Sequence, residues 1–591
     1  MTKQNKMKEL HSEYQLGDII PNIATFLKRN VVKFHDRYVY QEKNANGEYE
    51  GIKWEYLYDN IEKIAFNLNQ AGFKKGEKMI LFTRNRMEML ELELAIMAYG
   101  GVTVPIFAHF KQDTAELLIN HSGATWMAVA GQEQMNNLGG ELNQLKSIFH
   151  FDKVDDNRYG NLMPFSELQK NIPQGEKSCI DESIDSDTIC LNMYTSGTMG
   201  TPKCVQLTHK NILSQQAALD IIWDVNENDR FLAYLPWHHS FGGIFELFTA
   251  LYNGATYYLE SSYGRDANSI FENWKLVRPT IFFSVPKVYQ SLYEKTLASK
   301  EAEDIFFNSG LKFIFTAAAA LPEKLSQEFQ KRNIPVIEGW GLTETSPCCT
   351  LTDPNLKRVS GVVGKPIPGV SIRIADDEEI QVKGPNVMVE YYHNDEANNG
   401  VFTEDGWYRT GDVGALTETG LKLISRKDRI FKLSNGEKVV PTDLEKVIEL
   451  KCHYVQHVII SGSGEDHPVA LIFPNRKMLE KPDYQMSPED GCFVPRSLNE
   501  LGRCLQGCLQ DANCDIKQKF SKIKSAAIIN SELSLDDNTL TPSMKVAPKN
   551  VLERYKTHLI NMYGEDVPTD EEVYVVELDV KNNIARKIVQ D

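Results

Sequence analysis

The sequence has no long apolar run and no excess of positive charge. No stretch reaches the roughly 18 to 20 apolar residues that a membrane-spanning helix requires, and the first residues lack the apolar core and small-residue cleavage site of a signal peptide. With 64 Lys and Arg against 81 Asp and Glu, the net charge is −17, which repels nucleic-acid phosphates and anionic lipid headgroups. These absences predict a cytoplasmic protein with no nucleic-acid partner.

Cysteine is also scarce, with 10 residues in a chain of 591 and no paired CxxC spacing. Reduced thiols are therefore expected rather than disulfides or a zinc site. Cys504 and Cys508 are spaced to share a helix face, with Cys514 nearby. Two interpretations of these cysteines remain: partly buried thiols or a metal site. The remaining composition, 42% hydrophobic and 25% charged, is typical of a globular protein with several buried cores.

Strand and helix patterns alternate through the first 350 or so residues. Apolar residues recur at helical spacing from Trp54 to Ala71, a strand is expected over 78–82, a helix over 88–101 and another strand over 102–107. Further strands are expected at ATWMAVAG, FLAYLP, ATYYLE, TIFFSVP, KFIFTAAAA and IPVIEGWG. This alternation predicts parallel sheets covered by helices.

The pattern changes after Pro347 to short β-like runs rich in glycine and turn signals. Near residue 428 the chain becomes strongly charged, and a capped helix pattern over 442–451 and two strand patterns follow. The segment 481–520 resembles an insertion. The expected fold class is α/β, with a large N-terminal domain (1–427) of α/β layers that includes a β-rich subdomain, joined by a hinge to a small α+β C-terminal domain (428–591).

The most specific local signal is YTSGTMGTPK, which runs from Tyr194 to Lys203 after an apolar strand. Small hydroxyl residues and glycines let backbone N–H groups and hydroxyls approach phosphate oxygens, and Lys203 adds a positive charge. The run lacks the Gly-Lys-Ser/Thr ending of a Walker loop. The residues expected to bind phosphate are Thr195, Ser196, Gly197, Thr198, Gly200, Thr201 and Lys203.

This loop resembles the phosphate loop of the adenylate-forming superfamily, which joins carboxylic acids to AMP and then usually to coenzyme A. Four more motifs follow in the expected order: EGWGLTET (338–345) for adenine and magnesium, YRTGD (408–412) for ribose, SRKDR (425–429) with Gly436 and Glu437 for the hinge, and LTPSMK (540–545) for the catalytic lysine. The chain is therefore identified as a member of that superfamily.

The resemblance assigns a role to each matching residue. Asp412 would grip adjacent ribose hydroxyls with two carboxylate oxygens, and Trp340, where the superfamily commonly has Tyr, would stack on adenine. Glu344 would hold Mg²⁺ at the phosphates, with Thr195 as a weaker candidate ligand. A turn aspartate, a core tryptophan and a solvated glutamate are the corresponding structural alternatives.

The resemblance also gives Lys545 the catalytic role in adenylation, against the alternative of a solvated surface lysine, and gives Asp428 the hinge position. It adds to the nucleotide-binding set Ala317, Ala318, Gly341, Thr343 and Arg426. The chain departs from the family pattern at four positions. Alanine replaces the family glycine at 317 and 318, and the added methyl groups leave the preferred acyl chain length open. Cys204 replaces the usual glycine. Ser425 replaces glycine or aspartate.

The run LPWHHSFGG (235–243) resembles the acyl-pocket motif of the superfamily. The resemblance makes His239 a catalytic candidate that borders the substrate carboxylate, and gives the following apolar helix the role of a pocket wall. A pair of capping or packing histidines is the structural alternative.

Other segments, among them TIFFSVPKVYQSLYEK and the run from Leu540 to Glu565, resemble long-chain fatty acyl-CoA synthetases. The implied substrates are a fatty acid, ATP and coenzyme A, with Mg²⁺ as cofactor, and peripheral membrane contact is compatible with an amphiphilic product. The alternatives are a ligase that loads acyl-AMP onto a carrier protein, an aryl-acid CoA ligase and, from a different class, a non-catalytic nucleotide-binding protein. The oligomeric state is not predicted.

Overall fold

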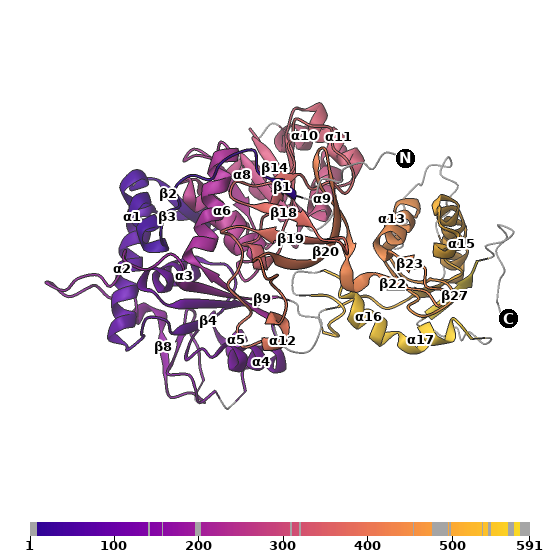
Figure 1. Ribbon diagram of the computed structural model, residues 1–591. Coiled ribbons are helices and arrows are strands. Elements are labelled where there is room, and N and C mark those ends of the chain that lie inside the picture. Colours follow the sequence, from indigo (N-terminus) through magenta and orange to yellow (C-terminus); the bar gives the residue numbers. More distant parts are fainter. Residues whose placement is uncertain are drawn as a thin grey trace. The chain divides into compact units, whose positions relative to one another are not determined.

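The computed structural model of the chain (Figure 1) describes residues 9–139, 142–156, 158–195, 203–307, 310–317, 321–452, 454–475, 495, 498–534, 536–541, 545–564 and 573–578. The chain forms two compact units. The first comprises Met1–Thr410 and Ala415–Lys422, and the second comprises Gly411–Gly414 and Leu423–Asp591.

The first unit contains a sheet whose described strands have the order β10-β9-β5-β4-β6-β7-β8. Neighbours are parallel except β10, which returns antiparallel to β9. The strands are β4 (Lys78–Phe82), β5 (Val102–Ile106), β6 (Trp126–Val129), β7 (Ser147–His150), β8 (Leu162–Pro164), β9 (Ile189–Thr195) and β10 (Lys203–Thr208). The short elements α5 (Gln132–Asn136) and η1 (Phe165–Glu167) lie in its connections.

Three helices of this unit pack together: α1 (Ile23–Phe34), α2 (Trp54–Gln70) and α3 (Met87–Tyr99) (Figure 1). Every residue of α3 from Met89 to Tyr99 is buried, as expected for a helix that is covered on all sides. The next helix, α4 (Gln112–Ser122), follows β5 and contributes to the core beside β4 and β6.

A second sheet of the same unit has the described order β17-β16-β15-β14-β13-β11-β12-β2-β3. Its inner strands from β15 to β2 are parallel. The strands are β2 (Tyr38–Lys43), β3 (Tyr49–Lys53), β11 (Arg230–Ala233), β12 (Thr256–Leu259), β13 (Ile281–Ser284), β14 (Phe313–Thr316), β15 (Val336–Trp340), β16 (Thr350–Leu351) and β17 (Lys365–Pro366).

The connections of this second sheet carry most of the remaining helices. They are α6 (His209–Ile222), the π-helical turn η2 (Phe241–Glu246), α7 (Leu247–Tyr252), α8 (Ala267–Val277), α9 (Pro286–Ala298), α10 (Lys300–Phe307), α11 (Glu323–Lys331) and the short η3 (Thr343–Thr345). The strand and helix alternation predicted from the apolar runs is thereby confirmed.

An aromatic cluster joins η2 to strands β13 and β14. The ring centroids of Phe245 and Phe315 lie 4.8 Å apart, those of Phe283 and Phe315 lie 5.0 Å apart, and those of Trp223 and Phe313 also lie 5.0 Å apart. Phe241 joins the cluster at 5.6 Å from Phe315. Aromatic pairs at such separations contribute about 0.5 to 1.5 kcal/mol each beyond their buried area.

After Pro347 the chain forms the β-rich part that its glycine and turn pattern predicts. The elements are β18 (Ser371–Ile374), β19 (Glu379–Lys383), α12 (Asp395–Asn398), β20 (Tyr408–Thr417) and β21 (Gly420–Arg426), and β1 (Glu9–His11) pairs with β18. The division between the two units falls within β20 and again within β21.

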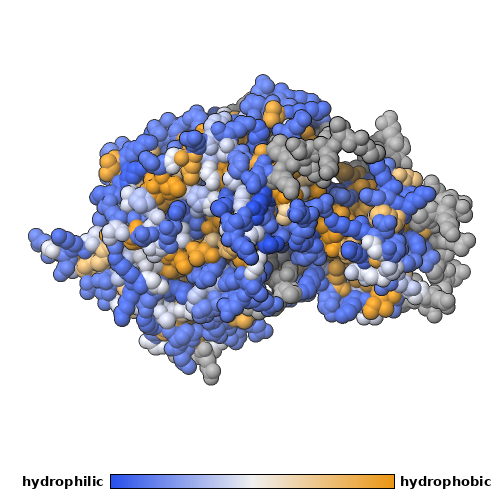
Figure 2. All heavy atoms as spheres, in the orientation of Figure 1, coloured by the Kyte–Doolittle hydropathy of each residue, from blue (hydrophilic) through white to orange (hydrophobic). Residues whose placement is uncertain are grey.

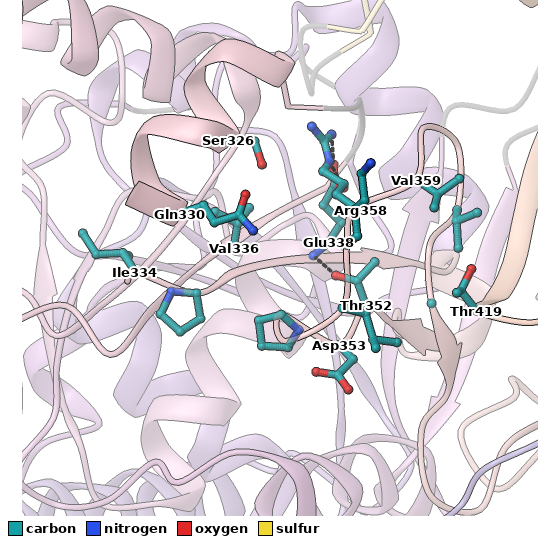
Figure 3. A pocket seen from close by; sticks show the side chains of 16 residues that line it. Ser326, Gln330, Ile334, Val336, Glu338, Thr352, Asp353, Arg358, Val359 and Thr419 are labelled. Carbon is teal, nitrogen blue, oxygen red and sulfur yellow. Dashed lines mark hydrogen bonds and ion pairs between the residues drawn. The ribbon is translucent and has the colours of Figure 1, made fainter. Parts of the chain in front are cut away.

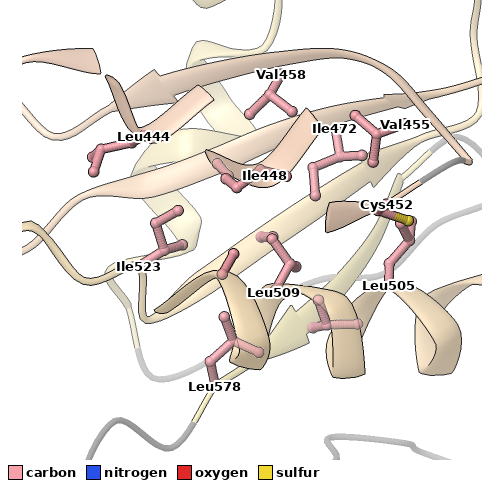
Figure 4. Packing of buried hydrophobic residues seen from close by; sticks show 14 of the residues in the cluster. Leu444, Ile448, Cys452, Val455, Val458, Ile472, Leu505, Leu509, Ile523 and Leu578 are labelled. Carbon is pink, nitrogen blue, oxygen red and sulfur yellow. The ribbon is translucent and has the colours of Figure 1, made fainter. Parts of the chain in front are cut away.

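The second unit is an α+β layer built on the sheet β24-β25-β26-β27. Alternate residues of its strands enter two separate apolar clusters, one with α13 and α15 (Figure 4) and the other with α16 and α17. The elements are η4 (Lys427–Arg429), β22 (Phe431–Lys432), β23 (Lys438–Val439), α13 (Pro441–Lys451), β24 (Val455–Ser461), β25 (Val469–Pro474), α15 (Leu498–Asp515), η6 (Lys519–Ser521), β26 (Ser525–Ile529), α16 (Pro548–Arg554), α17 (Lys556–Asn561) and β27 (Val573–Glu577).

Helix α15 lies in the segment that resembles an insertion, yet Leu505 and Leu509 of this helix pack into the core of the unit. Cys504 is buried in the same cluster, Cys508 packs against it and Cys514 is exposed. The expected fold class, a large unit of α/β layers with a β-rich part and a small α+β unit, is confirmed.

In the part of the chain that the structure describes, no helix is both long and apolar enough to cross a membrane. Hydrophilic residues predominate on the face shown in Figure 2, with hydrophobic residues between them in patches.

Candidate active site

Three predicted site segments meet at one edge of the second sheet. Strands β11, β13, β14 and β15 are parallel, so their carboxyl ends share an edge. His239 lies in the segment after β11, Ala317 directly follows β14, and Trp340 is the last residue of β15. A hydrogen bond of 3.0 Å between the hydroxyls of Ser240 and Thr343 ties the first segment to the third. In open α/β sheets this edge is where ligands bind.

The ring of His239 is fixed by its own turn. Its Nδ1 accepts a hydrogen bond of 3.2 Å from the backbone N–H of Phe241, so a neutral ring carries its proton on Nε2. Gly243 permits this tight turn, because a Cβ there would lie 2.1 Å from the carbonyl oxygen of Trp237. The half-buried His239 therefore presents a donor suited to a carboxylate oxygen.

The adjacent His238 has a different environment. Burial lowers its pKa to about 3, and the neighbouring His239 and His109 act in the same direction, so this ring is neutral at pH 7. Its centroid lies 5.1 Å from that of Phe107, and within the described residues its buried Nε2 has no hydrogen-bond partner. Of the two histidines, His238 is the one that packs.

The ends of the predicted phosphate-binding loop are held by an antiparallel strand pair. Thr195 closes β9 opposite Lys203, the first residue of β10, and its hydroxyl donates to the Lys203 carbonyl at 3.4 Å. Cys204 pairs with Tyr194 and is fully buried, and burial raises the pKa of its thiol to about 12. The predicted nucleotide-binding residues that lie outside the described part of the chain are Ser196, Gly197, Thr198, Gly200, Thr201 and, after β14, Ala318.

The segment after β15 places the adenine and magnesium candidates. Trp340 is 8% exposed and Glu344, in η3, is 9% exposed. Gly341 lies so close to the returning chain that a Cβ there would lie 1.6 Å from the carbonyl oxygen of Pro347. Oε1 of Glu344 accepts a hydrogen bond of 2.6 Å from the hydroxyl of Tyr391.

The predicted ligands, the carboxylate of Glu344 and the hydroxyl of Thr195, are chemically suited to a magnesium ion. In the described ranges no group of three or more His, Cys, Asp or Glu side chains could hold a metal. Mg²⁺ in nucleotide sites usually keeps water and phosphate ligands and needs only one or two protein oxygens. Because Tyr391 engages Oε1 of Glu344, Oε2 is the oxygen that would face such an ion.

A cavity of about 80 Å³ lies beside β15 (Figure 3). At its wall, Nε and Nη2 of Arg358 each donate to Glu338 at 2.6 Å, and Nη1 donates to the carbonyl of Leu321 at 2.5 Å. Oε1 of Glu338 also accepts the N–H of Leu321 at 3.2 Å. The Arg358–Glu338 pair therefore connects Leu321 to strand β15.

Replacement of Arg358 by methionine should lower the free energy of unfolding by about 1 to 3 kcal/mol, since the largely buried Glu338 loses a charged partner. Urea denaturation measures this loss. Methionine at both 358 and 338 should recover part of it, because no unpaired charge remains. The exposed pair of Lys556 and Glu553 is the control, and Lys556→Met should change stability by less than about 1 kcal/mol. Equal losses for the Arg358 and Lys556 variants would contradict the assignment.

In the second unit, Arg426 connects two predicted residues. Its Nη1 donates to Oδ1 of Asp412 at 2.9 Å, and its Nε lies 3.8 Å from Oδ1 of Asp428. Asp412 is 8% exposed, whereas Arg426 and Asp428 are exposed. The ribose candidate, a second nucleotide-binding candidate and the hinge candidate therefore form one charged group.

Lys545 lies in a short turn of the second unit. Its N–H donates to the hydroxyl of Thr541 at 3.1 Å, its carbonyl accepts the N–H of Thr541 at 2.7 Å, and Leu540 and Val546 form a β-bridge around the turn. The turn thus fixes the backbone of Lys545. Burial lowers the pKa of its ammonium group, and the nearby Asp412 carboxylate opposes that shift.

Two residues at these sites were not predicted from the sequence. Tyr391 contacts Glu344 across 47 positions of the chain, and Arg358 contacts Glu338 across 20. Neither lies in a motif with a recognisable role, so no local signal identifies them.

Comparison with known proteins assigns the chain to a family. The family model described as AMP-binding enzyme matches residues 27–392, and the model described as AMP-binding enzyme C-terminal domain matches residues 428–567.

Relatives match along most of the chain. Fatty acyl-CoA synthetase A of Dictyostelium discoideum is 26% identical, over 88% of this chain and 86% of the relative. The long-chain-fatty-acid–CoA ligase FadD15 of Mycobacterium bovis is 24% identical, over 90% of this chain and 95% of the relative.

Solved structures share the fold. The O-succinylbenzoate coenzyme A synthetase MenE of Bacillus subtilis in complex with AMP matches with a TM-score of 0.70 at 22% identity, over 90% of this chain and 98% of that one. The anthranilate CoA ligase AuaEII in complex with anthranoyl-AMP matches with a TM-score of 0.72 at 20% identity, over 92% and 99%. The first family model alone spans more than half of the chain, and the predicted resemblance is confirmed: the chain belongs to the AMP-binding enzyme family.

Proposed function

We propose that the chain is a long-chain fatty acid–CoA ligase that forms an acyl-AMP intermediate from ATP. The observation that carries the proposal is the aromatic cluster that begins at Phe241, two residues after His239, and continues through Phe245, Phe283 and Phe315. An acyl chain whose carboxylate meets His239 would have an apolar wall beside it. Relatives named as fatty acyl-CoA synthetases, at 24 to 26% identity, support the same substrate class.

In the first step, one carboxylate oxygen of the fatty acid attacks the α-phosphorus of ATP, and the bond from that phosphorus to the bridging oxygen breaks, which releases pyrophosphate. Nε2–H of His239 donates to the carboxylate and orients it. The hydroxyl of Thr195 and the ammonium groups of Lys203 and Lys545 stabilise the charge that builds on the phosphate oxygens. Asp412 and Arg426 bind the ribose, and Trp340 stacks on adenine. Glu344 and Thr195 would hold Mg²⁺, whose charge offsets that of the phosphates.

In the second step, the thiolate of coenzyme A attacks the carbonyl carbon of acyl-AMP. The bond from that carbon to the AMP oxygen breaks, and acyl-CoA and AMP leave. Asp428 is proposed as the hinge between domains 1–427 and 428–591, which allows Lys545 to serve the first step and withdraw for the second.

A panel of carboxylic acids tests the substrate class. Each additional buried methylene contributes about 0.8 kcal/mol, so kcat/KM should rise about fourfold per methylene until the chain exceeds the apolar surface that can bury it. The measurement is acyl-CoA formation with acids from hexanoate to octadecanoate, with benzoate-type acids in parallel. A higher kcat/KM for a benzoate-type acid than for hexadecanoate would contradict the fatty-acid assignment, and product on a carrier protein without free acyl-CoA would favour the carrier alternative.

A further inference from the structure

Tyr391 lies on a segment that runs beside the strand leaving the phosphate loop. The N–H of Tyr392 donates to the carbonyl of Cys204 at 2.8 Å, and Tyr391 forms a β-bridge with Val205. Asn398 fixes Tyr391 from the other side, because its side chain accepts the N–H and donates to the carbonyl of Tyr391, both at 2.8 Å. The backbone position of Tyr391 is therefore set by β10 and by Asn398.

The side chain of Tyr391 reaches two predicted site residues. It is 3% exposed, and its hydroxyl donates to Oε1 of Glu344 at 2.6 Å. The ammonium group of Lys203 lies 5.2 Å from the centre of its ring, within cation–π range. The hydroxyl of Tyr408 lies 3.4 Å from that of Tyr391. One buried ring thus contacts the metal candidate through its hydroxyl and the phosphate-loop lysine through its face.

The hydrogen bond from Tyr391 restricts the orientation of the Glu344 carboxylate. Among the residues that the structure describes, it is the only side-chain hydrogen bond to this carboxylate. A glutamate has three rotatable side-chain bonds, and a fixed Oε1 restricts where Oε2 can point. Loss of the hydroxyl would leave the carboxylate in place and release its orientation.

We infer that Tyr391 is a positioning residue that orients the carboxylate of Glu344 for a divalent cation on ATP and aligns Lys203 with the same phosphates. This inference rests on the proposed function, since it needs a metal–nucleotide complex at Glu344. Partners that orient a metal ligand commonly change metal affinity by 10- to 100-fold when removed.

The test is binding of Mn²⁺ to the full chain in the presence of α,β-methylene-ATP, measured by electron paramagnetic resonance. Tyr391→Phe keeps the ring and removes the hydroxyl, and we expect the Kd for Mn²⁺ to rise about 10- to 100-fold. The matched control is Tyr99→Phe, a buried tyrosine of the first unit whose hydroxyl bonds to the carbonyl of Phe73 at 2.9 Å. This control should leave the Kd for Mn²⁺ unchanged.

A double-mutant cycle with Glu344→Gln separates positioning from general stability. If Tyr391 acts through Glu344, Tyr391→Phe should change the Kd for Mn²⁺ little in the Glu344→Gln background. Thermal unfolding of each variant identifies a temperature at which all variants are folded, and binding is measured there. An unchanged Kd in Tyr391→Phe, or equal effects in both backgrounds, would overturn the inference and leave the proposed function standing. Failure of the unsubstituted chain to bind Mn²⁺ with the nucleotide would instead count against the proposed function.

Discussion

Replacement of Lys545 by alanine should lower acyl-AMP formation by at least about 100- to 1000-fold, because one preorganised charge or donor at a transition state is worth that much. The transfer from acyl-AMP to coenzyme A should survive. The hydrogen bonds between Lys545 and Thr541 are made by the backbone of Lys545, so they remain in the alanine variant.

Two separate assays distinguish the steps. One supplies ATP with hexadecanoate and measures pyrophosphate release, and the other supplies synthetic acyl-AMP with coenzyme A. Lys517→Ala, an exposed lysine of the same unit, is the matched control and should change neither step. Equal losses in both assays for Lys545→Ala would show that Lys545 supports folding or general binding, and the assignment of two conformations would fail with it.

Replacement of Asp412 by alanine should raise the KM for ATP by about 30- to 1000-fold. The loss of charge-assisted hydrogen bonds to ribose corresponds to about 2 to 4 kcal/mol. Arg426 would lose one carboxylate partner and keep Asp428 nearby, so the folded unit should persist. Steady-state kinetics with ATP as the varied substrate measure the effect.

The control for Asp412 is another aspartate paired with an arginine. Asp405 accepts from Arg373 at 2.6 Å in the first unit, and Asp405→Ala should leave the KM for ATP unchanged. A near-normal KM for ATP in a folded Asp412→Ala chain would remove Asp412 from the ribose site.

The strands of the large unit and the ordering of the site segments could be predicted from the sequence. Apolar runs bounded by glycine and proline mark β4, β5 and β11 to β15, since a strand buried on both faces leaves a local signature. His239, Trp340 and Glu344 were predictable because they lie in motifs whose order identifies the family. Their local structure then follows from short-range constraints, such as the lack of space for a side chain at Gly341.

Contacts between distant segments could not be predicted in this way. The bond from Tyr391 to Glu344 depends on how residues 389–392 lie beside β10, and no periodicity encodes that crossing. The packing of α15 was missed for a related reason. Its sequence is largely polar, and only the position of the sheet shows that Leu505 and Leu509 face a core.

The most direct test of the central claim follows oxygen from the fatty acid. Hexadecanoate labelled with ¹⁸O in its carboxylate is incubated with the chain, ATP, Mg²⁺ and coenzyme A, and the products are analysed by mass spectrometry. If acyl-AMP forms and is then attacked by the thiolate, one ¹⁸O atom appears in AMP for each acyl-CoA made. Label in inorganic phosphate with ADP as product, or no acyl-CoA at all, would contradict the account.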